Sequence, residues 1–144
     1  MRRVKRILES KGHDIWSIEP SASVYDAIHV LAERQIGALL VMKEDQLVGI
    51  FSERDYARQI ILKDRSSEDT KVEEIMTKKV LHVQPNDVID DCMALMTKKR
   101  IRHLPVVENK KVVGMISIGD LVSAVIAEQQ STINDLEKYI SGQG

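Results

Sequence analysis

A seven-residue pattern that occurs twice constrains the fold of this chain more than any other feature. Residues 49–55 read GIFSERD, and residues 114–120, 65 positions later, read GMISIGD. Each copy follows a β-branched apolar run and then offers Ser-x-x-Asp, which predicts a strand that leads into a capped helix. A helix start at the end of a strand presents free backbone N–H groups, which makes it a candidate anion site.

The same offset relates residues well outside the two motifs, without a gap. Identical residues recur at Pro20/Pro85, Asp26/Asp91, Ile36/Ile101, Leu39/Leu104, Val41/Val106, Val48/Val113 and Ile61/Ile126. We therefore predict a duplicated unit. The predicted organisation is an N-terminal amphipathic segment at 1–14, a first repeat at 15–63, a linker at 64–79, a second repeat at 80–130 and a C-terminal helical extension at 131–144.

Apolar periodicity predicts the order β-α-β-β-α within each repeat. In the first repeat, a short strand at 15–18 precedes a helix capped by Ser23, and the continuous apolar run 38–42 is typical of a strand covered on both faces. A polar turn at 43–46 and a second strand lead to a helix through Leu62. Residues 80–83 are expected to open the second repeat as 15–18 open the first. The predicted fold class is α/β (α+β), with both repeats in one compact unit.

Composition excludes several kinds of function. The 144 residues are 43% hydrophobic but only 3% aromatic, and the net charge is −1, so nothing attracts nucleic acid or an anionic membrane globally. No apolar run is long enough to cross a bilayer, and the basic start lacks the apolar segment of a signal peptide, so we expect a cytoplasmic protein. The single Cys92 excludes an internal disulfide, and its helical spacing with Ile89, Met93 and Met96 predicts a buried position.

Two interpretations of Ser-x-x-Asp compete. In a capping box, Ser52 and Ser117 would cap the amides of Asp55 and Asp120, whose carboxylates would reach back. Capping alone does not require the glycine three residues before each serine, and a glycine inside a strand usually marks a close approach to the backbone. The complete pattern, occurring twice, favours a ligand site.

At this point the sequence resembles a known family. An x-Pro segment, a helix, an apolar strand and then G-h-h-S-x-x-D, where h is apolar, resemble the cystathionine-β-synthase (CBS) domain, and two copies resemble a CBS pair (Bateman module) that stands alone without an effector domain. The resemblance covers nearly the whole chain except the first dozen residues and the C-terminal tail. It implies two repeats related by a pseudo-twofold axis, with two clefts that bind adenosine-containing ligands.

The resemblance also implies roles for individual residues. Asp120 and Asp55 would accept hydrogen bonds from ribose hydroxyls, and Ser117 and Ser52 would lie near the ribose or α-phosphate. Met115 and Ile50 would pack on the adenine. The opposite wall would be Lys11, Trp16, Ile36 and Gly37 in the Asp120 cleft, and Met76, Leu81, Ile101 and Arg102 in the Asp55 cleft.

The two clefts are not expected to be equivalent. Arg54 stands in one motif where Gly119 stands in the other, and Arg102-His103 replaces the Gly37-Ala38 of the first repeat. We expect Arg102, His103 and Arg54 to hold phosphate charge. The alternatives are that Arg102 and His103 form a solvated surface pair, and that Trp16 is a core residue.

The predicted function is a regulatory module that senses an adenine nucleotide and transmits its occupancy to a regulated protein. The sequence does not choose among AMP, ADP, ATP, NAD and S-adenosylmethionine. The alternative is a protein-interaction or dimerisation module with no physiological nucleotide. Catalysis, a catalytic cofactor and a metal site are not expected, because the histidines lack metal-ligand spacing and there is no Gly-rich Lys-Ser/Thr phosphate loop.

We predict a homodimer whose contacts use the repeat helices and the C-terminal extension. Its apolar residues recur at helical spacing after the repeats are complete: Ile133, Leu136, Tyr139 and Ile140. Such a surplus apolar face implies a partner surface. The alternative is that the tail folds back on its own subunit.

Overall fold

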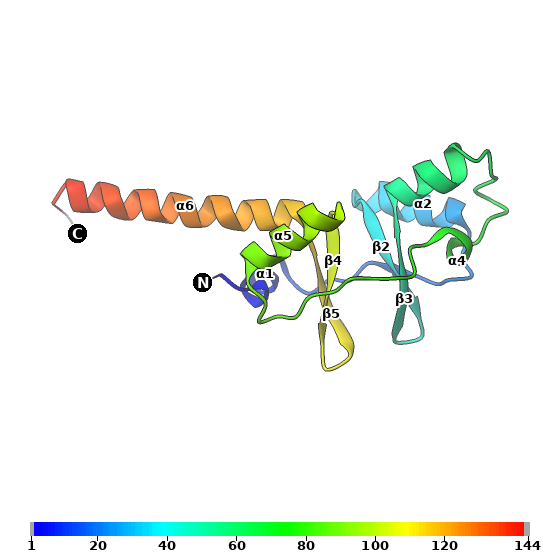
Figure 1. The fold of residues 1–144 in the computed structure, drawn as a ribbon, viewed down its shortest axis with the longest axis horizontal. Coiled ribbons are helices and arrows are strands. Elements are labelled where there is room, and N and C mark those ends of the chain that lie inside the picture. The colour runs from blue at the N-terminus through cyan, green and yellow to red at the C-terminus, as the bar shows by residue number, and fades with distance from the viewer. Residues whose placement is uncertain (1, 143–144) are drawn as a thin grey trace.

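The computed structural model describes residues 2–142, so the extreme ends of the two predicted terminal segments, Met1 and residues 143–144, lie outside the described residues. Two β-hairpins stand side by side with helices around them, and one long helix extends away from the body (Figure 1). The elements are α1 (Val4–Lys11), β1 (Ser17–Ile18), α2 (Val24–Arg34), β2 (Ala38–Lys43), β3 (Gln46–Ser52), α3 (Glu53–Tyr56), the π-helix η1 (Ala57–Ile61), α4 (Val72–Ile75), α5 (Ile89–Lys99), β4 (His103–Glu108), β5 (Lys111–Ser117) and α6 (Ile118–Ile140). The predicted mixed α+β class is confirmed.

The first repeat has the predicted order β-α-β-β-α. Its sheet runs β1-β2-β3, with β1 parallel to β2 and β2 antiparallel to β3. Residues 38–41 are all buried, as their continuous apolar run predicts. Ser23 caps α2 by accepting a hydrogen bond from the amide of Asp26 at 3.0 Å. This repeat therefore follows directly from the periodicity and the capping signals.

The second repeat lacks the predicted strand at 80–83. Its sheet contains β4 and β5 only, and a single parallel bridge joins Val83 to Val106. In the first repeat the amide of Leu40 donates to the carbonyl of Trp16 at 3.1 Å. The counterpart of Leu40 is Pro105, which has no N–H to donate, so the equivalent hydrogen bond cannot form and the strand is reduced to a bridge.

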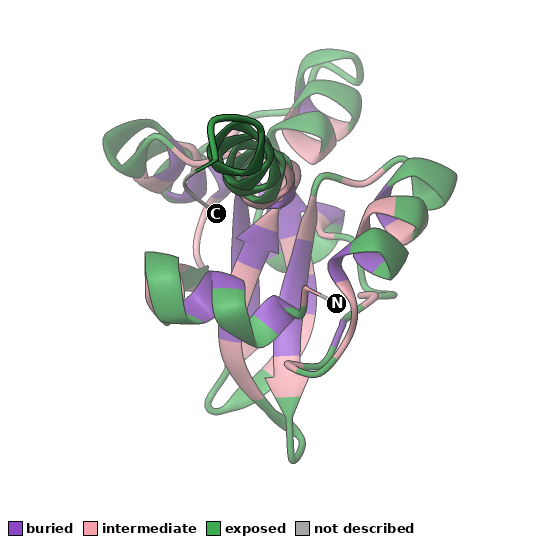
Figure 2. Cartoon of the chain, turned by 90° about the vertical axis from the view of Figure 1, so that its left-hand side faces the viewer, coloured by how far each residue is buried: buried purple, intermediate pink, exposed green. Residues whose placement is uncertain are grey.

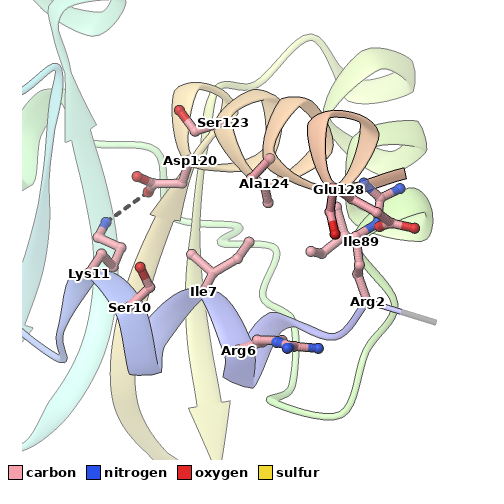
Figure 3. Close-up of a pocket in the computed structure, with 12 residues that line it drawn as sticks. Arg2, Arg6, Ile7, Ser10, Lys11, Ile89, Asp120, Ser123, Ala124 and Glu128 are labelled. Atoms are coloured by element: carbon pink, nitrogen blue, oxygen red, sulfur yellow. Dashed lines mark hydrogen bonds and ion pairs between the residues drawn. The ribbon is translucent and has the colours of Figure 1, made fainter. Parts of the chain in front are cut away.

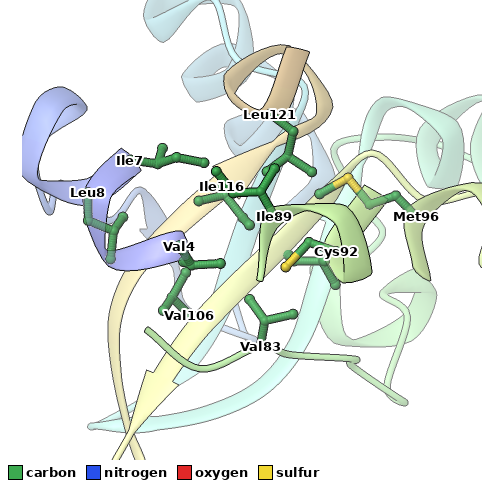
Figure 4. Packing of buried hydrophobic residues seen from close by; sticks show 11 residues of the cluster. Val4, Ile7, Leu8, Val83, Ile89, Cys92, Met96, Val106, Ile116 and Leu121 are labelled. Carbon is green, nitrogen blue, oxygen red and sulfur yellow. The ribbon is translucent and has the colours of Figure 1, made fainter. Parts of the chain in front are cut away.

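The N-terminal helix packs on the second repeat, although the first repeat follows it in sequence. Val4, Ile7 and Leu8 of α1 lie in one cluster with buried residues of α5, β4, β5 and α6 (Figure 4). Cys92 belongs to the same cluster and is 1% exposed, which confirms its predicted burial. Burial raises the pKa of its thiol to about 11, with Asp87 and Asp91 adding to the effect.

The segment 70–76 makes the matching contacts on the first repeat. The amide of Val72 donates to the carbonyl of Ala22 at 2.8 Å, just as the amide of Val4 donates to that of Asp87 at 2.9 Å. Val72 and Ile75 lie in the first-repeat core around Phe51. Each repeat is thus completed by a helix that precedes it, and the largely buried strands lie between helices with exposed outer faces (Figure 2).

The last helix, α6, has 23 residues and extends far beyond the body (Figure 1). Residues 131–140 of the predicted C-terminal extension belong to this continuous helix. Its apolar residues do not fold back on the subunit: Ile133 is 47% exposed, Leu136 56%, Tyr139 79% and Ile140 83%. The described chain therefore leaves an apolar stripe open to solvent.

Candidate functional site

Both Ser-x-x-Asp turns are complete capping boxes. Ser52 Oγ accepts from the amide of Asp55 at 3.2 Å, and Asp55 Oδ2 accepts from the amide of Ser52 at 3.0 Å. The corresponding distances between Ser117 and Asp120 are 3.2 and 2.8 Å. The capping interpretation is therefore correct, and it uses only one oxygen of each carboxylate, which leaves the other for a further donor.

The glycine of each motif is explained by packing. A Cβ at Gly49 would lie 2.4 Å from Met76 Sδ, and one at Gly114 would lie 2.7 Å from Leu8 Cδ2. Close approach to the backbone was the right expectation, but the approaching group is a protein side chain in both repeats. These glycines therefore give no separate support for a ligand, since a protein side chain from the segment that precedes each repeat accounts for them.

Asp120 forms an ion pair with Lys11. Lys11 Nζ, at the end of α1, lies 2.7 Å from Asp120 Oδ2 and 2.8 Å from the carbonyl oxygen of Met115 (Figure 3). Burial alone would raise the pKa of Asp120, but the hydrogen bonds from Lys11 and Ser117 and the charge of Lys11 lower it overall. The lowered pKa favours the ionised carboxylate. Within residues 2–142, Asp120 Oδ1 accepts no hydrogen bond, so one oxygen is available.

Asp55 has a hydroxyl partner in place of a cation. Thr77 Oγ1 donates to Asp55 Oδ1 at 3.2 Å. Thr77 is held there by two backbone hydrogen bonds with Ile50, of 3.0 and 2.9 Å. Sequence reasoning missed Thr77 because the segments before the two repeats do not follow the 65-residue offset: their helices start 68 residues apart, at Val4 and Val72, and α1 has eight residues where α4 has four.

His103 lies where the two repeats meet. A Cβ at Gly37 of the first repeat would be 3.1 Å from His103 Cε1. Burial lowers the pKa of His103; Asp120 acts in the opposite direction, and Lys11 and Arg102 lower it further. His103 is partly buried and therefore does not form a solvated surface pair with Arg102, which is exposed.

The two arginines expected to bind phosphate point to different surroundings. The Arg54 guanidinium donates to the carbonyl oxygen of Arg100 in the second repeat. The backbone carbonyl of Arg102 accepts from the amide of Ile118 at 2.9 Å, whereas its side chain makes no hydrogen bond or ion pair within the described part of the chain. Arg54 is thus engaged in an inter-repeat contact, whereas the exposed side chain of Arg102 has no partner among residues 2–142.

The remaining predicted wall residues pack mainly within their own repeats. Trp16 is partly buried on the first-repeat core with the Arg34 guanidinium 4.3 Å from its ring centroid, so its packing role is observed. Ile36 and Met76 pack on the first core, and Leu81 and Ile101 on the second. A Cβ at Gly119 would meet only Ser117 Oγ, at 3.6 Å, so this position is open.

A groove of about 770 Å³ lies between α1 and α6. Lys11 and Asp120 face each other at one end of it, and Arg2, Arg6, Ser10 and Ser123 also line it (Figure 3). Its size suits a small organic ligand. Of the residues predicted to bind ligand, only Lys11 and Asp120 line this groove.

Two further properties of residues 2–142 bear on function. No group of three or more His, Cys, Asp or Glu residues among them is arranged to hold a metal ion. None of the described helices combines the length and the apolar character needed to span a membrane.

Comparison with known proteins agrees with this architecture. The family profile described as CBS domain matches residues 4–62 and 72–127. The solved structure of a protein with CBS domains from Burkholderia ambifaria is 53% identical, with a TM-score of 0.87 over 89% of this chain and 96% of that chain. The CBS domain-containing protein CBSX3, mitochondrial, of Arabidopsis thaliana is 40% identical over 149 aligned residues, which cover 96% of this chain and 72% of CBSX3.

A more distant structure carries ligands. The CBS domain pair of protein MJ0100, solved in complex with 5′-methylthioadenosine and S-adenosyl-L-methionine, is 26% identical, with a TM-score of 0.76 over 90% of this chain and 98% of that one. The chain spans only 24% to 43% of the length of three other curated relatives that it matches.

Proposed function

This chain belongs to the CBS-domain family, with two copies of the domain, and we propose that it is a regulatory module that binds an adenosine-containing ligand between its repeats. Binding would change the stability or shape of the pair, and a regulated protein would respond to that change. An aqueous compartment that holds adenine nucleotides, such as the cytoplasm, suits this function. Catalysis is not part of the proposal.

One observation carries the proposal: a partly buried, ionised carboxylate with an oxygen to spare stands at the start of α6. Asp120 is ordered by its capping bonds and by Lys11, and its Oδ1 can accept from a ribose hydroxyl. Asp55 occupies the matching position at the start of α3. The adenosyl ligands of the MJ0100 pair, a relative with the same fold, support the choice of ligand class.

Thermal shift on nucleotide-free protein tests the proposal. We expect at least one of AMP, ADP, ATP, NAD, 5′-methylthioadenosine and S-adenosylmethionine to raise the melting temperature, because a ligand at 100 times its dissociation constant adds about 2.7 kcal/mol to the stability of the folded state. Asp120→Ala or Asp55→Ala should reduce that gain. Asp135→Ala, on the exposed part of α6, is the matched control and should retain it. A melting temperature that none of these ligands changes would contradict the proposal.

The phosphate end is proposed to depend on Arg102. Its guanidinium is exposed and free to form a fork with phosphate oxygens. Arg102→Ala should weaken AMP or NAD markedly and adenosine little, as titration calorimetry would show. Equal losses for AMP and adenosine would make this arginine a structural residue. Arg54 would first have to leave the Arg100 carbonyl, so we expect Arg54→Ala to have the smaller effect.

A dimerisation module is the second candidate function, and the exposed stripe of α6 favours it. Val122, Ile126, Ile133, Leu136 and Ile140 recur at intervals of three, four and seven residues on a helix that leaves the body, which suits pairing with a second copy. Light scattering on the full chain and on a variant that ends at Gln130 tests this candidate. A dimer for the full chain and a monomer for the shorter variant would support it, whereas a monomeric full chain would exclude it.

A further inference from the structure

The carboxylates of the two turns differ in the charge of their partner. The ammonium group of Lys11 donates a hydrogen bond to Asp120 at 2.7 Å, and the neutral hydroxyl of Thr77 donates one to Asp55 at 3.2 Å. Asp55 takes part in no ion pair within residues 2–142, and the lysines that follow Thr77 in sequence, Lys78 and Lys79, are exposed. Within the described residues, the carboxylate charge therefore has an ion-pair partner at the Asp120 turn and none at the Asp55 turn.

Lys11 is held in place by the fold of α1. Val4, Ile7 and Leu8 fix this helix in the core of the second repeat, and Gly12 ends it at φ 99° directly after Lys11. The ammonium group also donates to the carbonyl oxygen of Met115, one residue after the motif glycine. Two acceptors hold the Lys11 ammonium group, and the buried face of α1 fixes the helix that carries it, so Lys11 is a positioned part of the turn at Asp120 although its side chain is partly exposed.

The resemblance assigned Arg102 to the Asp55 cleft, but its carbonyl oxygen accepts from the amide of Ile118 at 2.9 Å, so its backbone lies at the start of α6, near Asp120. Burial lowers the pKa of His103, and Lys11 and Arg102 lower it further. His103 pairs with Ser117, the residue that caps α6, across β4 and β5. The side chain of Arg102 is unpaired within the described part of the chain, so its charge is available to a ligand. A phosphate placed near the ribose hydrogen-bonded to Asp120 would meet these cations, whereas a phosphate near Asp55 would face an uncompensated carboxylate.

We propose that Lys11 makes the Asp120 cleft selective for phosphorylated adenosyl ligands, whereas the Asp55 cleft takes an uncharged or cationic adenosyl ligand. This inference rests on the proposed function and assigns a charge class of ligand to each cleft. Lys11 keeps its bond to Asp120 Oδ2 while Oδ1 accepts the ribose hydroxyl, so the lysine and the ligand share the carboxylate without competing. The neutral partner Thr77 gives the other cleft no such preference for anions.

Titration calorimetry on nucleotide-free full-length protein, with AMP and 5′-methylthioadenosine as probes, tests the inference. Asp55→Asn leaves the Asp120 cleft intact and should bind AMP better than 5′-methylthioadenosine; Asp120→Asn leaves the Asp55 cleft intact and should show the reverse. In the Asp55→Asn background, Lys11→Met should weaken AMP about 10- to 100-fold, the value of a charge-assisted hydrogen bond, and 5′-methylthioadenosine no more than about twofold.

Two further variants separate charge from structure. Lys11→Arg keeps the charge and should retain most of the AMP affinity, and Thr77→Lys, in the Asp120→Asn background, should make the Asp55 cleft prefer AMP. Urea unfolding of each variant identifies those that are not folded. Equal losses of both ligands in Lys11→Met, or tighter binding of AMP by that variant, would overturn the inference while leaving the proposed function intact. A wild-type protein that binds neither probe would overturn the inference, and one that binds none of the six ligands named above would overturn the proposed function as well.

Discussion

The turns at Asp55 and Asp120 share their backbone and differ in their side-chain partners. Both are capping boxes, and in both a side chain from a preceding helix fills the space above the motif glycine. The groups around the two carboxylates differ. Asp55 is bonded by a threonine hydroxyl and Asp120 by a lysine ammonium group. The strand that pairs with the capping serine starts with Ala38 in the first repeat and with His103 in the second. The features that the repeats share are those that the fold requires, and the features that differ lie where a ligand would be distinguished.

The helices that complete the two repeats show a second contrast. The eight-residue α1 inserts Leu8, 1% exposed, against Gly114, whereas the four-residue α4 places the partly buried Met76 against Gly49. The second repeat should therefore depend more on its preceding helix than the first repeat does. Substitutions at matched positions measure this difference.

The largest effect is expected from Leu8→Ala, at about 2–5 kcal/mol of unfolding free energy, because it removes a fully buried side chain and leaves a cavity. Met76→Ala is the matched variant of the first repeat and should cost less, since Met76 is only partly buried. Urea unfolding followed by circular dichroism measures both. A larger loss of stability for Met76→Ala than for Leu8→Ala would contradict the expectation that the second repeat depends more on its preceding helix than the first repeat does.

Gly114→Ala should cost about 1–3 kcal/mol, because the added methyl group would overlap Leu8 and force it to move. The double variant Leu8→Ala/Gly114→Ala should be more stable than the sum of the single effects predicts, since each change makes room for the other. The Gly49→Ala and Met76→Ala pair is the corresponding cycle in the first repeat. Additive effects in both cycles would mean that the glycine and the side chain packed on it are not energetically coupled, which would contradict the packing explanation for these glycines.

A smaller, pH-dependent effect is expected at Asp120. Its folded-state pKa is lowered, so its contribution to stability is complete above the unfolded value of about 3.9 and is lost as pH falls through the folded value. The stability difference between wild type and Asp120→Asn should thus be constant above about pH 5 and shrink below pH 4. A difference that stays constant down to pH 2, measured by urea unfolding, would contradict the lowered pKa.

The smallest effect is expected at His103, which has no titrating counterpart in the first repeat because Ala38 stands there. Burial lowers its folded-state pKa, so the unfolded chain binds the proton more readily. Wild type should lose stability as pH falls from about 7 to 5, and His103→Gln should lose less over the same window. Parallel pH profiles for the two proteins would show that His103 titrates equally in both states.

The order of elements could be predicted from sequence because the apolar periods and caps are local signals. The absence of a strand before α5 could also have been predicted. In the first repeat the amide of Leu40 donates to the carbonyl of Trp16, and Pro105, its counterpart in the second repeat, has no amide hydrogen to donate. The sequence predicted a close approach at Gly49 and Gly114 but not which groups approach. Leu8 lies far from Gly114 along the chain, so only the tertiary fold shows that the two residues are in contact.

Within the candidate site, the capped carboxylates follow from the motif, whereas their partners depend on tertiary packing. The family resemblance placed Lys11 near Asp120, where the structure also has it. Thr77 was not predicted, because the segments that precede the two repeats are related by a different offset from the repeats themselves. The position of His103 against Gly37 depends on how the repeats meet, which no local pattern encodes.

The packing of α1 on the second repeat has a consequence for the order in which the protein folds during synthesis. Lys11 and Asp120 are 109 positions apart, so α1 leaves the ribosome long before its docking surface exists. At roughly 5–20 residues per second, its apolar face waits on the order of 5–20 s for β5 and α6. By the time β5 and α6 are synthesised, the first repeat already has α4, the helix that completes it. We therefore expect the first repeat to fold as a unit while α1 is still undocked, and the second repeat to fold last. The basic residues along α1, such as Lys5 and Arg6, would keep the waiting segment in solution.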